Sequence, residues 1–289
     1  MTPLIVIVGP TASGKTALAV ELAIRFNGEI ICADSRTIYR DMNIGTAKPS
    51  HEDQLAVPHW GIDIVDPGDR FTAADFKRYA NTKIDEIRAR GHTPFLVGGT
   101  GLYVDAVVFD YKFGVQADQE LREKLSKYTL EELHEYCIKN NIKLPENQLN
   151  KRYVIRAIEQ AGVNNRRKQH PISTSIIVGI ATDRQILRTR IEHRTEQLFK
   201  NGVVEEAIML GKKYGWSSEA MTGNIYPLIH QFTQGTMTLL EVKNKFTTLD
   251  WRLAKRQLTW LRRNTYIKWY GLSDAEHYLS DLLASDSKP

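Results

Sequence analysis

Short hydrophobic runs alternate with polar turns through the first hundred residues. Residues 4–8 are apolar throughout and end at Gly9, and residues 30–33 end at Asp34. A third run, residues 94–97, leads into the sequence Gly-Gly-Thr-Gly. Continuous apolar runs of this length are typical of strands that are buried on both faces of a parallel sheet. We therefore expect three core strands, each followed at its carboxyl end by a polar or glycine-rich turn.

Helical periodicity fills the gaps between these strands. Residues 15–26 carry apolar side chains at helical spacing. Thr72 and Asp75 have the spacing of a capping box, which predicts a helix that begins there and ends at Gly91. Alternation of strand, turn and helix is the pattern of a doubly wound α/β fold, in which helices flank a mostly parallel sheet.

The pattern changes after about residue 110. Residues 118–140 predict two short helices, and Thr129 and Glu132 form a capping box at the start of the second. A polar, turn-rich stretch follows, and residues 151–161 predict another helix. The later expected elements are a strand at 175–181, helices at 183–200, 203–214 and 239–262, and a frayed tail after Ser280.

These changes divide the chain into two parts. We interpret residues 111–150 as a small helical insertion domain. Residues 1–110 and 151–289 then form the α/β core together with its C-terminal helices.

Residues 9–16 read Gly-Pro-Thr-Ala-Ser-Gly-Lys-Thr and fit the pattern G-x-x-x-x-G-K-[ST]. In such a loop the backbone N–H groups and the helix N-terminus bind phosphate, Lys15 reaches terminal phosphates and Thr16 is a ligand for Mg²⁺. A chance match in a glycine-rich turn is the alternative, but this motif follows a predicted strand and opens a predicted helix. The sequence therefore predicts a P-loop NTPase-like core, without telling hydrolysis from other chemistry. The expected phosphate-binding residues are Gly9, Pro10, Thr11, Ala12, Ser13, Gly14, Lys15 and Thr16.

The acidic residue that a P-loop ATPase uses to orient water is not found at the end of the third strand. Residues 95–97 are followed by two glycines in place of an acid, which argues against a water-activating ATPase. Asp34 is the nearest candidate acid, at the carboxyl end of the second strand, where ligands of open α/β sheets bind. It is a candidate base for an attacking amine or hydroxyl. A structural cap of the following turn is the alternative role.

Composition and charge narrow the setting. The chain of 289 residues has a net charge of +5 and a pI of about 9.0, which is weak evidence for an anionic partner. Basic side chains gather in residues 151–170 and 251–269. No apolar run is long enough to span a bilayer, and the first residues lack the features of a signal peptide. Two cysteines, Cys32 and Cys137, cannot form a four-cysteine zinc site, so we expect a soluble protein of the reducing cytoplasm and no membrane partner.

Further motifs extend beyond the P-loop. They are Asp-Ser-Arg-Thr-Ile-Tyr-Arg-Asp-Met at 34–42, Asn-Ile-Gly-Thr-Ala-Lys-Pro at 43–49, Val-Gly-Gly-Thr-Gly-Leu-Tyr at 97–103, Arg-Ala-Ile-Glu at 156–159 and Ala-Lys-Arg-Gln-Leu-Thr-Trp at 254–260. Together they resemble the tRNA dimethylallyltransferase family, also called tRNA isopentenylpyrophosphate transferases, in order and across nearly the whole chain. The sequence is similar to the bacterial form, because it shows no Cys/His cluster near its end, where eukaryotic relatives add a zinc finger.

The resemblance implies a reaction and roles within it. The family transfers the five-carbon group of dimethylallyl diphosphate to N6 of adenine 37 in tRNA and releases diphosphate. By this resemblance the P-loop, with Lys15 and Mg²⁺, holds the diphosphate, and Thr11 donates a hydrogen bond to its bridging oxygen. Asp34 takes the N6 proton. Thr16 is the implied protein ligand of Mg²⁺.

The resemblance also implies the tRNA-binding residues. A helical insertion binds the anticodon stem-loop in this family, and residues 110–150 are the matching segment. The protein is expected to act as a monomer. For the basic residues of the tRNA-binding set, the alternative is that they lie on a solvated helix face and bind no tRNA. The implied tRNA-binding residues are Asp34, Ser35, Arg36, Thr37, Thr100, Arg122, Lys151, Arg152 and Arg156.

Three segments depart from the family pattern. Residues 221–227 stand where an Ile-Gly-Tyr-[Lys/Arg]-[Glu/Gln] segment is usual, and only Gly223 matches. Asp250 and Trp251 replace an expected Thr-Arg pair, and Tyr153 stands where arginine is common. All three lie in the half of the chain that, in the family, completes the active site and binds tRNA.

Three other functions fit part of the pattern. An adenylate isopentenyltransferase prenylates free nucleotides and needs no tRNA-binding insertion. A nucleoside or small-molecule kinase would share the P-loop but leaves the Asp-Ser-Arg-Thr and Gly-Gly-Thr-Gly turns unexplained. A non-catalytic RNA-binding protein has no need of an intact P-loop and Asp34.

Overall fold

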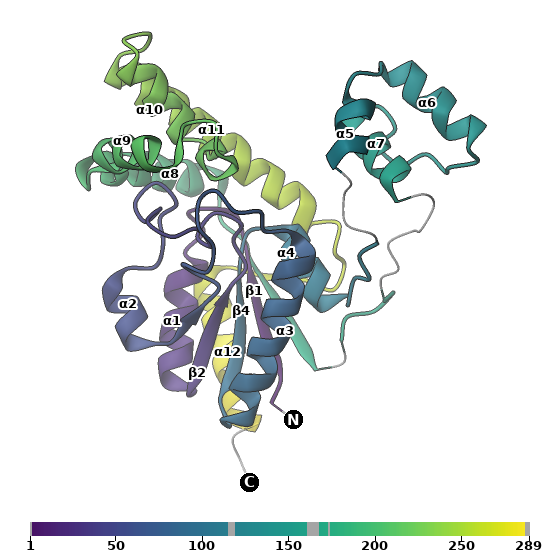
Figure 1. Ribbon diagram of the computed structural model, residues 1–289. Helices are drawn as coiled ribbons and strands as arrows, with labels where there is room; N and C mark the ends of the chain where they lie inside the picture. The colour runs from purple at the N-terminus through teal and green to yellow at the C-terminus, as the bar shows by residue number, and fades with distance from the viewer. Residues whose placement is uncertain (1, 115–118, 161–167, 173, 287–289) are drawn as a thin grey trace. The chain divides into compact units, whose positions relative to one another are not determined.

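The computed structural model describes residues 2–114, 119–160, 168–172 and 174–286. It divides into two compact units, one formed by residues 1–109 and 170–289 and the other by residues 110–169. Figure 1 shows the course of the chain through both. Each unit is described by itself.

A six-stranded parallel sheet forms the centre of the larger unit. Its strand order is β3-β2-β4-β1-β5-β6, and every pair is parallel, which confirms the predicted sheet. β1, β2 and β4 are wholly buried, because helices cover both faces and their sequences are almost entirely apolar. The strands are β1 (Leu4–Val8), β2 (Gly28–Cys32), β3 (His59–Trp60), β4 (Thr93–Gly98), β5 (Ser175–Ile180) and β6 (Lys268–Tyr270).

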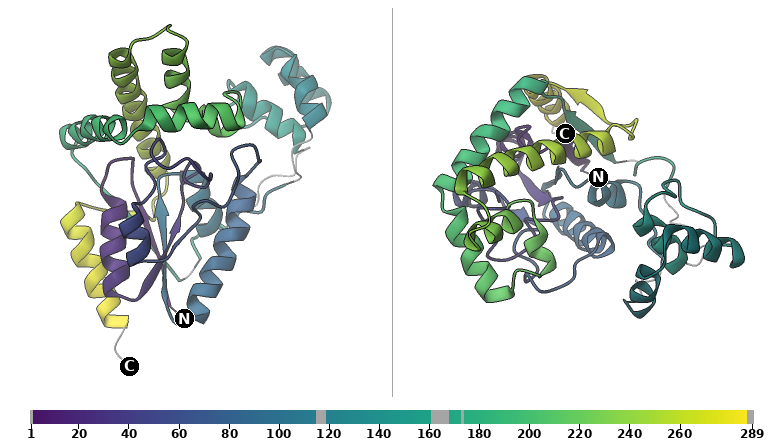
Figure 2. Two further views of the ribbon diagram at one scale, coloured as in Figure 1. Left: turned by 60° about the vertical axis from the view of Figure 1, so that its left-hand side comes forward. Right: turned by 90° about the horizontal axis from the view of Figure 1, so that it is seen from above.

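Two pairs of helices cover the sheet, one on each face (Figure 2). α1 (Lys15–Arg25) packs beside α12 (Leu272–Asp286), and α3 (Ala73–Ala89) packs beside α4 (Gly101–Val108). The expectation of a frayed tail after Ser280 is wrong, because α12 continues to Asp286. Ala275, Leu279 and Leu283 anchor it by packing into the core under α1.

The remaining helices of this unit gather beyond the carboxyl ends of the strands (Figure 1). Their apolar faces enclose a second core, which also takes in Ile38, Tyr39 and Met42 from the loop after β2. This loop is therefore held between the sheet and the C-terminal helices. These helices are α8 (Arg184–Lys200), α9 (Val203–Tyr214), α10 (Tyr226–Thr233) and α11 (Leu239–Leu261), with the short helix η1 (Glu219–Thr222), while α2 (His51–Ala56) lies earlier in the chain.

The described residues of the smaller unit form three short helices: α5 (Gln119–Ser126), α6 (Leu130–Lys139) and α7 (Lys151–Glu159). The predicted capping box of Thr129 and Glu132 is confirmed at the start of α6. Our predicted insertion ended at residue 150, but the compact unit continues to residue 169. The reason is that α7 buries Val154, Ile155 and Ile158 against α5 and α6.

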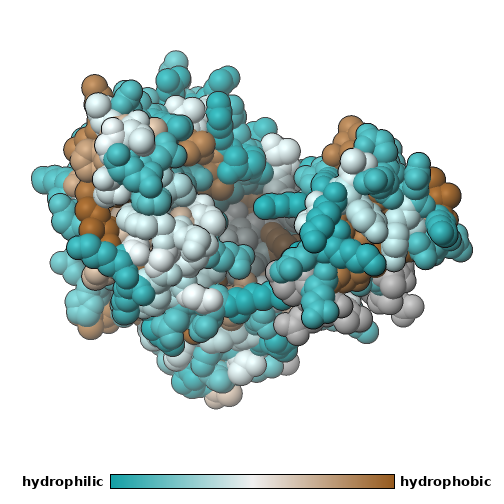
Figure 3. Space-filling view, turned by 45° about the horizontal axis from the view of Figure 1, so that its top comes forward, coloured by the Kyte–Doolittle hydropathy of each residue, from teal (hydrophilic) through white to brown (hydrophobic). Residues whose placement is uncertain are grey.

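The surface is largely hydrophilic on the face that Figure 3 shows, with hydrophobic side chains in separate patches. Among the described residues, no helix has both the length and the apolar character needed to cross a bilayer.

Candidate active site

Three loops meet at the carboxyl edge of the sheet. They follow β1, β4 and β2, which are neighbours in the sheet. Because the strands are parallel, the P-loop, the Gly-Gly-Thr-Gly turn and Asp34 emerge at the same edge. The local sequence patterns therefore place the three predicted pieces of the site side by side.

The P-loop has the tight backbone that phosphate binding requires. Gly14 has φ of 90° and Ala12 a φ of 61°, a left-handed conformation that is uncommon for a residue with a side chain. Thr11 and Ser13 are buried, and the Ser13 hydroxyl has no hydrogen-bond partner in the described structure. Gly14 ends the loop as the N-cap of α1, so the helix N-terminus points its free N–H groups toward the loop.

Two glycines let these loops approach closely. A Cβ atom on Gly98 would lie 2.1 Å from the carbonyl oxygen of Ala33, at the end of β2. A Cβ atom on Gly99 would lie 3.1 Å from the carbonyl oxygen of Gly9 and 2.4 Å from Nε2 of Gln257. The turn after β4 thus requires glycine on both sides, because the backbones of the neighbouring loops fill the space.

Lys15 lies in the P-loop with its Nζ donating to the carbonyl oxygen of Pro10 at 3.1 Å. Burial lowers the pKa of Lys15 to about 8, although the negative charge of Asp34 opposes the shift, and the positive charge of Arg194 adds to it. An anionic ligand beside Lys15 would favour its protonated form and reverse this cost.

Asp34 begins the turn after β2. Its Oδ1 accepts a hydrogen bond from the backbone N–H of Arg36 at 2.8 Å, so the turn-capping role that we considered is confirmed. A carboxylate has a second oxygen and further lone pairs, so capping leaves the chemical role available. The catalytic role of Asp34 stays a prediction.

The neighbours of Asp34 are held in place by later parts of the chain. The Thr100 hydroxyl accepts a hydrogen bond from the backbone N–H of Ser35 at 3.1 Å. Arg36 Nη1 donates to the carbonyl oxygens of Glu219 and Ala220, at 3.4 Å each, and so binds the first residues of η1. Thr37 is buried, and its hydroxyl has no hydrogen-bond partner in the described structure. Within the protein, Arg36 thus contacts η1 and Thr37 is buried. Their contact with tRNA stays a prediction.

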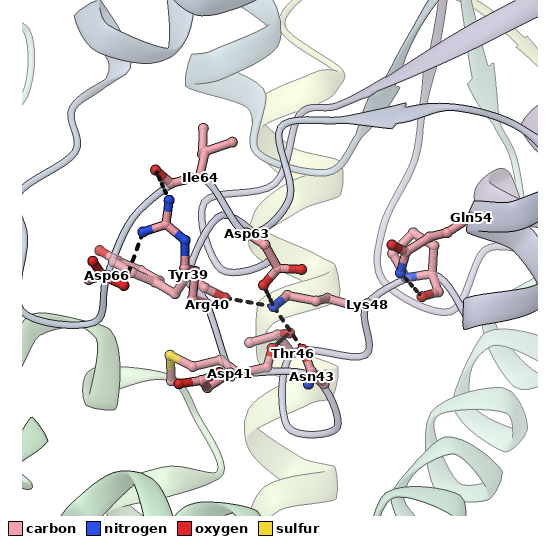
Figure 4. A network of polar contacts seen from close by, with 12 residues as sticks. Tyr39, Arg40, Asp41, Asn43, Thr46, Lys48, Gln54, Asp63, Ile64 and Asp66 are labelled. Carbon is pink, nitrogen blue, oxygen red and sulfur yellow. Dashed lines mark hydrogen bonds and ion pairs between the residues drawn. The ribbon is translucent and has the colours of Figure 1, made fainter. Parts of the chain in front are cut away.

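The loop from Tyr39 to Lys48 is fixed by two buried charges. Lys48 Nζ donates to the Tyr39 carbonyl oxygen at 2.6 Å, to Asn43 Oδ1 at 2.9 Å and to Asp63 Oδ1 at 2.5 Å (Figure 4). Glu206 accepts hydrogen bonds from three successive backbone N–H groups, those of residues 43–45, at 2.6–2.8 Å. The Asn-Ile-Gly-Thr-Ala-Lys motif is thus an anchor of the loop after Asp34.

Sequence reasoning missed two arginines that hold the P-loop, and it assigned no role to Gln257 within the 254–260 motif. Arg194 Nη1 donates to the Thr11 hydroxyl, and Arg190 Nη1 donates to the Ser13 carbonyl oxygen at 3.1 Å. From α11, Gln257 Oε1 accepts from the Thr11 backbone N–H at 2.8 Å. The two arginines are four residues apart and so share one face of α8. That spacing was the available signal, but Arg184 and Arg188 show the same spacing in the same helix.

In the smaller unit, the predicted tRNA-binding residues fall into two groups. Arg122 forms two hydrogen bonds with the buried Glu159, at 2.6 and 2.8 Å, and Arg156 forms a third at 3.0 Å. Lys151 Nζ donates to the Ser126 carbonyl oxygen, and Arg152 is exposed. The hydrogen bonds between Arg122 and Glu159 thus join α5 to α7, while the charged side chain of Arg152 lies in solvent. Arg166 and Arg167 of the predicted basic run lie outside the described residues.

The residues present fit a magnesium ion that is held mostly by its substrate. No group of three or more His, Cys, Asp or Glu side chains is arranged to hold a metal within the described residues. Thr16, in the first turn of α1, offers a hard oxygen ligand next to the phosphate loop. Mg²⁺ commonly binds through substrate phosphates and one or two protein oxygens, which this donor set can supply.

The fold and these loops define a P-loop α/β protein. A family model described as IPP transferase matches residues 37–264, and one described as Isopentenyl transferase matches residues 2–57. The chain belongs to the IPP transferase family. It is 39% identical to a tRNA dimethylallyltransferase of Desulforudis audaxviator over 94% of this chain and 93% of that protein. The tRNA dimethylallyltransferase of Streptococcus pyogenes serotype M3 is 38% identical over 95% of this chain and 92% of its own.

Solved structures show the same fold. The full-length tRNA isopentenylpyrophosphate transferase of Bacillus halodurans matches with a TM-score of 0.76 and 35% identity, over 99% of this chain and 98% of that one. A tRNA isopentenylpyrophosphate transferase of Staphylococcus epidermidis matches with a TM-score of 0.75 and 28% identity, over 99% of this chain and 100% of that one. These matches agree with the resemblance that the motifs indicated.

Proposed function

We propose that the protein transfers a dimethylallyl group from dimethylallyl diphosphate to N6 of adenine 37 in tRNA, releasing diphosphate. One observation carries this proposal. A complete P-loop, which Lys15 and Arg194 contact through Pro10 and Thr11, lies at the same sheet edge as Asp34. The arrangement pairs a cationic site for a diphosphate with a carboxylate for a proton, and the family to which the chain belongs includes relatives named for this reaction.

The leaving diphosphate is the centre of the proposed chemistry. As the bond between C1 of the prenyl group and the bridging oxygen breaks, negative charge grows on the diphosphate. Lys15, the loop N–H groups and Arg194 stabilise that charge more in the transition state than in the ground state. Thr11, held by Arg194, donates its hydroxyl proton toward the bridging oxygen. Mg²⁺, with Thr16 as a ligand, supplies further charge neutralisation when it is bound.

The acceptor is an amine that must lose a proton. N6 of adenine forms the new bond to C1, and Asp34 takes the proton that the nitrogen releases. Asp34 Oδ1 is oriented by the Arg36 backbone N–H, so the carboxylate has a fixed direction. The adenine has to leave its stack to reach this edge of the sheet, which costs a few kcal/mol.

Several basic surfaces support tRNA as the acceptor. Lys151 and Arg152 lie at the start of α7, and an exposed series on α11 and just beyond it comprises Lys255, Arg256, Arg262 and Arg263. We assign the anticodon stem-loop as the bound element, on the grounds of the helical unit. A monomer in a reducing cytoplasm is the proposed setting, and both Cys32 and Cys137 are buried as free thiols.

The test offers two acceptors in parallel. Purified protein, Mg²⁺ and radiolabelled dimethylallyl diphosphate are incubated with unmodified tRNA that has an adenine-rich anticodon loop, and separately with AMP. Label in tRNA alone is the expected result. Label in AMP would move the assignment to a free-nucleotide isopentenyltransferase, and label in neither would contradict the proposal.

A further inference from the structure

Two segments that depart from the family pattern meet in space. Asn224 follows the one conserved-pattern glycine of the 221–227 segment, and Asp250 stands where a threonine is usual. In the structure, Asn224 Nδ2 donates to Asp250 Oδ1 at 3.2 Å. The residues are 26 positions apart, on either side of α10 and the first half of α11. Their joint replacement therefore creates one local contact rather than two unrelated changes.

Asp250 is a buried carboxylate with one oxygen left over. Only 4% of the residue is exposed, and its Oδ2 has no hydrogen-bond partner in the described structure. Arg194 Nε, also buried and without a hydrogen-bond partner there, lies 4.0 Å from that oxygen. A buried charge is costly, and burial raises the pKa of Asp250, while the positive charge of Arg194 and the hydrogen bond from Asn224 favour the charged carboxylate.

The same guanidinium faces the P-loop on its other side. Its Nη1 donates to the hydroxyl of Thr11, the residue proposed to meet the bridging oxygen of the diphosphate. The side chain of Arg194 thus lies between Asp250 behind it and Thr11 in front. Arginine has many rotamers, and fixing one before the ligand binds saves entropy at the moment of binding.

We propose that Asp250, oriented by Asn224, is a positioning residue that holds Arg194 against the P-loop and so prepares the diphosphate site. This proposal rests on the proposed function, because it assumes that the P-loop binds a diphosphate. In the described structure the polar contacts of Asp250 are with Asn224 and Arg194, and not with Thr11. It acts through Arg194, and Asn224 acts through Asp250.

The experiment measures binding of inorganic diphosphate by calorimetry, with Mg²⁺, and kcat and KM for dimethylallyl diphosphate. Asp250→Asn keeps the shape of the side chain and the oxygen that Asn224 contacts, and it removes the charge. We expect diphosphate affinity to fall about tenfold, as for groups in one polar network, with a matching rise in KM. Asn224→Ala should weaken binding in the same direction by a smaller factor.

A double-mutant cycle separates positioning from general damage. In an Arg194→Ala background, Asp250→Asn should change diphosphate affinity by less than twofold, because the group through which it acts is gone. Glu29→Gln is the matched control, since Glu29 is also a buried carboxylate held by an arginine, Arg90, but lies on β2 with partners outside the P-loop. It should leave diphosphate affinity unchanged.

The outcomes are distinct. If the wild-type protein does not bind diphosphate, the proposed function fails and this inference fails with it. If the wild type binds diphosphate and both Asp250→Asn and Asn224→Ala bind it with the affinity of the wild type, the inference alone is wrong. Equal losses from Asp250→Asn in the presence and absence of Arg194 would also overturn it. Should Arg194→Ala not fold, the Asp250, Asn224 and Glu29 single variants still decide, because only the first two are expected to weaken binding.

Discussion

At the scale of single residues, Asp34 carries the chemical step of the proposed reaction. Asp34→Asn keeps the size of the side chain and an oxygen that can accept from the Arg36 N–H, so the turn should persist. An amide cannot take the N6 proton, and we expect kcat to fall by about 10²-fold or more. Steady-state prenylation of tRNA measures the loss, and calorimetric binding of inorganic diphosphate serves as the control for an intact P-loop. A wild-type rate in this variant would remove Asp34 from the mechanism.

Lys15 makes the diphosphate site sensitive to pH. Burial lowers its pKa to about 8, so the free protein loses this positive charge as the pH rises through 8. Only the protonated form attracts the diphosphate, and kcat/KM reports the free protein. We therefore expect kcat/KM for dimethylallyl diphosphate to be level below pH 8 and to fall by up to about tenfold per pH unit above it.

Lys15→Arg provides the control, because a guanidinium stays protonated throughout this range. Its kcat/KM should be lower than that of the wild type but should show no decline near pH 8. A wild-type profile that stays level to pH 9.5 would contradict the role given to the Lys15 charge.

Sequence alone assigned site roles at the sheet edge only to residues of the loops that directly follow a strand. The P-loop and Asp34 follow apolar strands directly, so strand order brought them together. Arg194 and Gln257 reach the loop from helices about 180 to 250 residues along the chain, and Asp250 lies behind Arg194. Helical periodicity tells that such residues share a face but not which face turns toward the P-loop, and that depends on how α8 and α11 pack.

At the scale of elements, the contact between α4 and α11 depends on a missing side chain. A Cβ atom on Gly101 would lie 2.0 Å from Cδ1 of Trp260, whose Nε1 donates to Asp105 at 2.7 Å. Gly101→Ala should therefore force the indole aside and lower the free energy of unfolding by about 1–3 kcal/mol. The better helix propensity of alanine offsets at most about 1 kcal/mol of that loss. Urea denaturation measures the difference.

Gly68→Ala is the matched control for this substitution. No atom lies within 4 Å of the Cβ position at Gly68, so we expect a change within about 0.5 kcal/mol. Equal stability of the two variants would show that Trp260 yields without cost.

Elements with strong local signals were predicted, and elements that depend on tertiary contacts were not. The capping boxes at Thr72 and Thr129 begin α3 and α6 as expected. The strands β3 and β6 have two and three residues, too few for a periodic pattern, and they exist because the sheet edge offers them partners. Fraying was expected for the last residues, but the core under α1 supplies apolar contacts that hold α12.

At the scale of the whole molecule, the boundary between the two units depends on which helices pack together, and the sequence does not show this. The polar stretch before Lys151 looked like a boundary. The apolar face of α7, however, pairs with α5 and α6, and Glu159 joins α7 to Arg122 of α5. Amphipathic faces show that a helix must be buried somewhere, and only the packed structure shows against which partner.

The excess of positive charge gives the molecule its proposed attraction for tRNA, and the smaller unit allows a test. Replacing both Lys151 and Arg152 with alanine removes two charges from the start of α7, one of them exposed and the other bound to a carbonyl oxygen at the end of α5. If both neutralise phosphates, the log-log slope of tRNA affinity against salt should become less steep by about 1–2, since each contact contributes about 0.7–0.9. Binding titrations at several salt concentrations measure this slope.

Lys139→Ala with Lys143→Ala removes the same charge from exposed positions of the same unit and should alter the slope by less than half as much. Equal slopes for the two double variants would show that general charge, and not these two side chains, attracts the tRNA, because screening acts on net charge wherever it sits while counterion release requires direct contact.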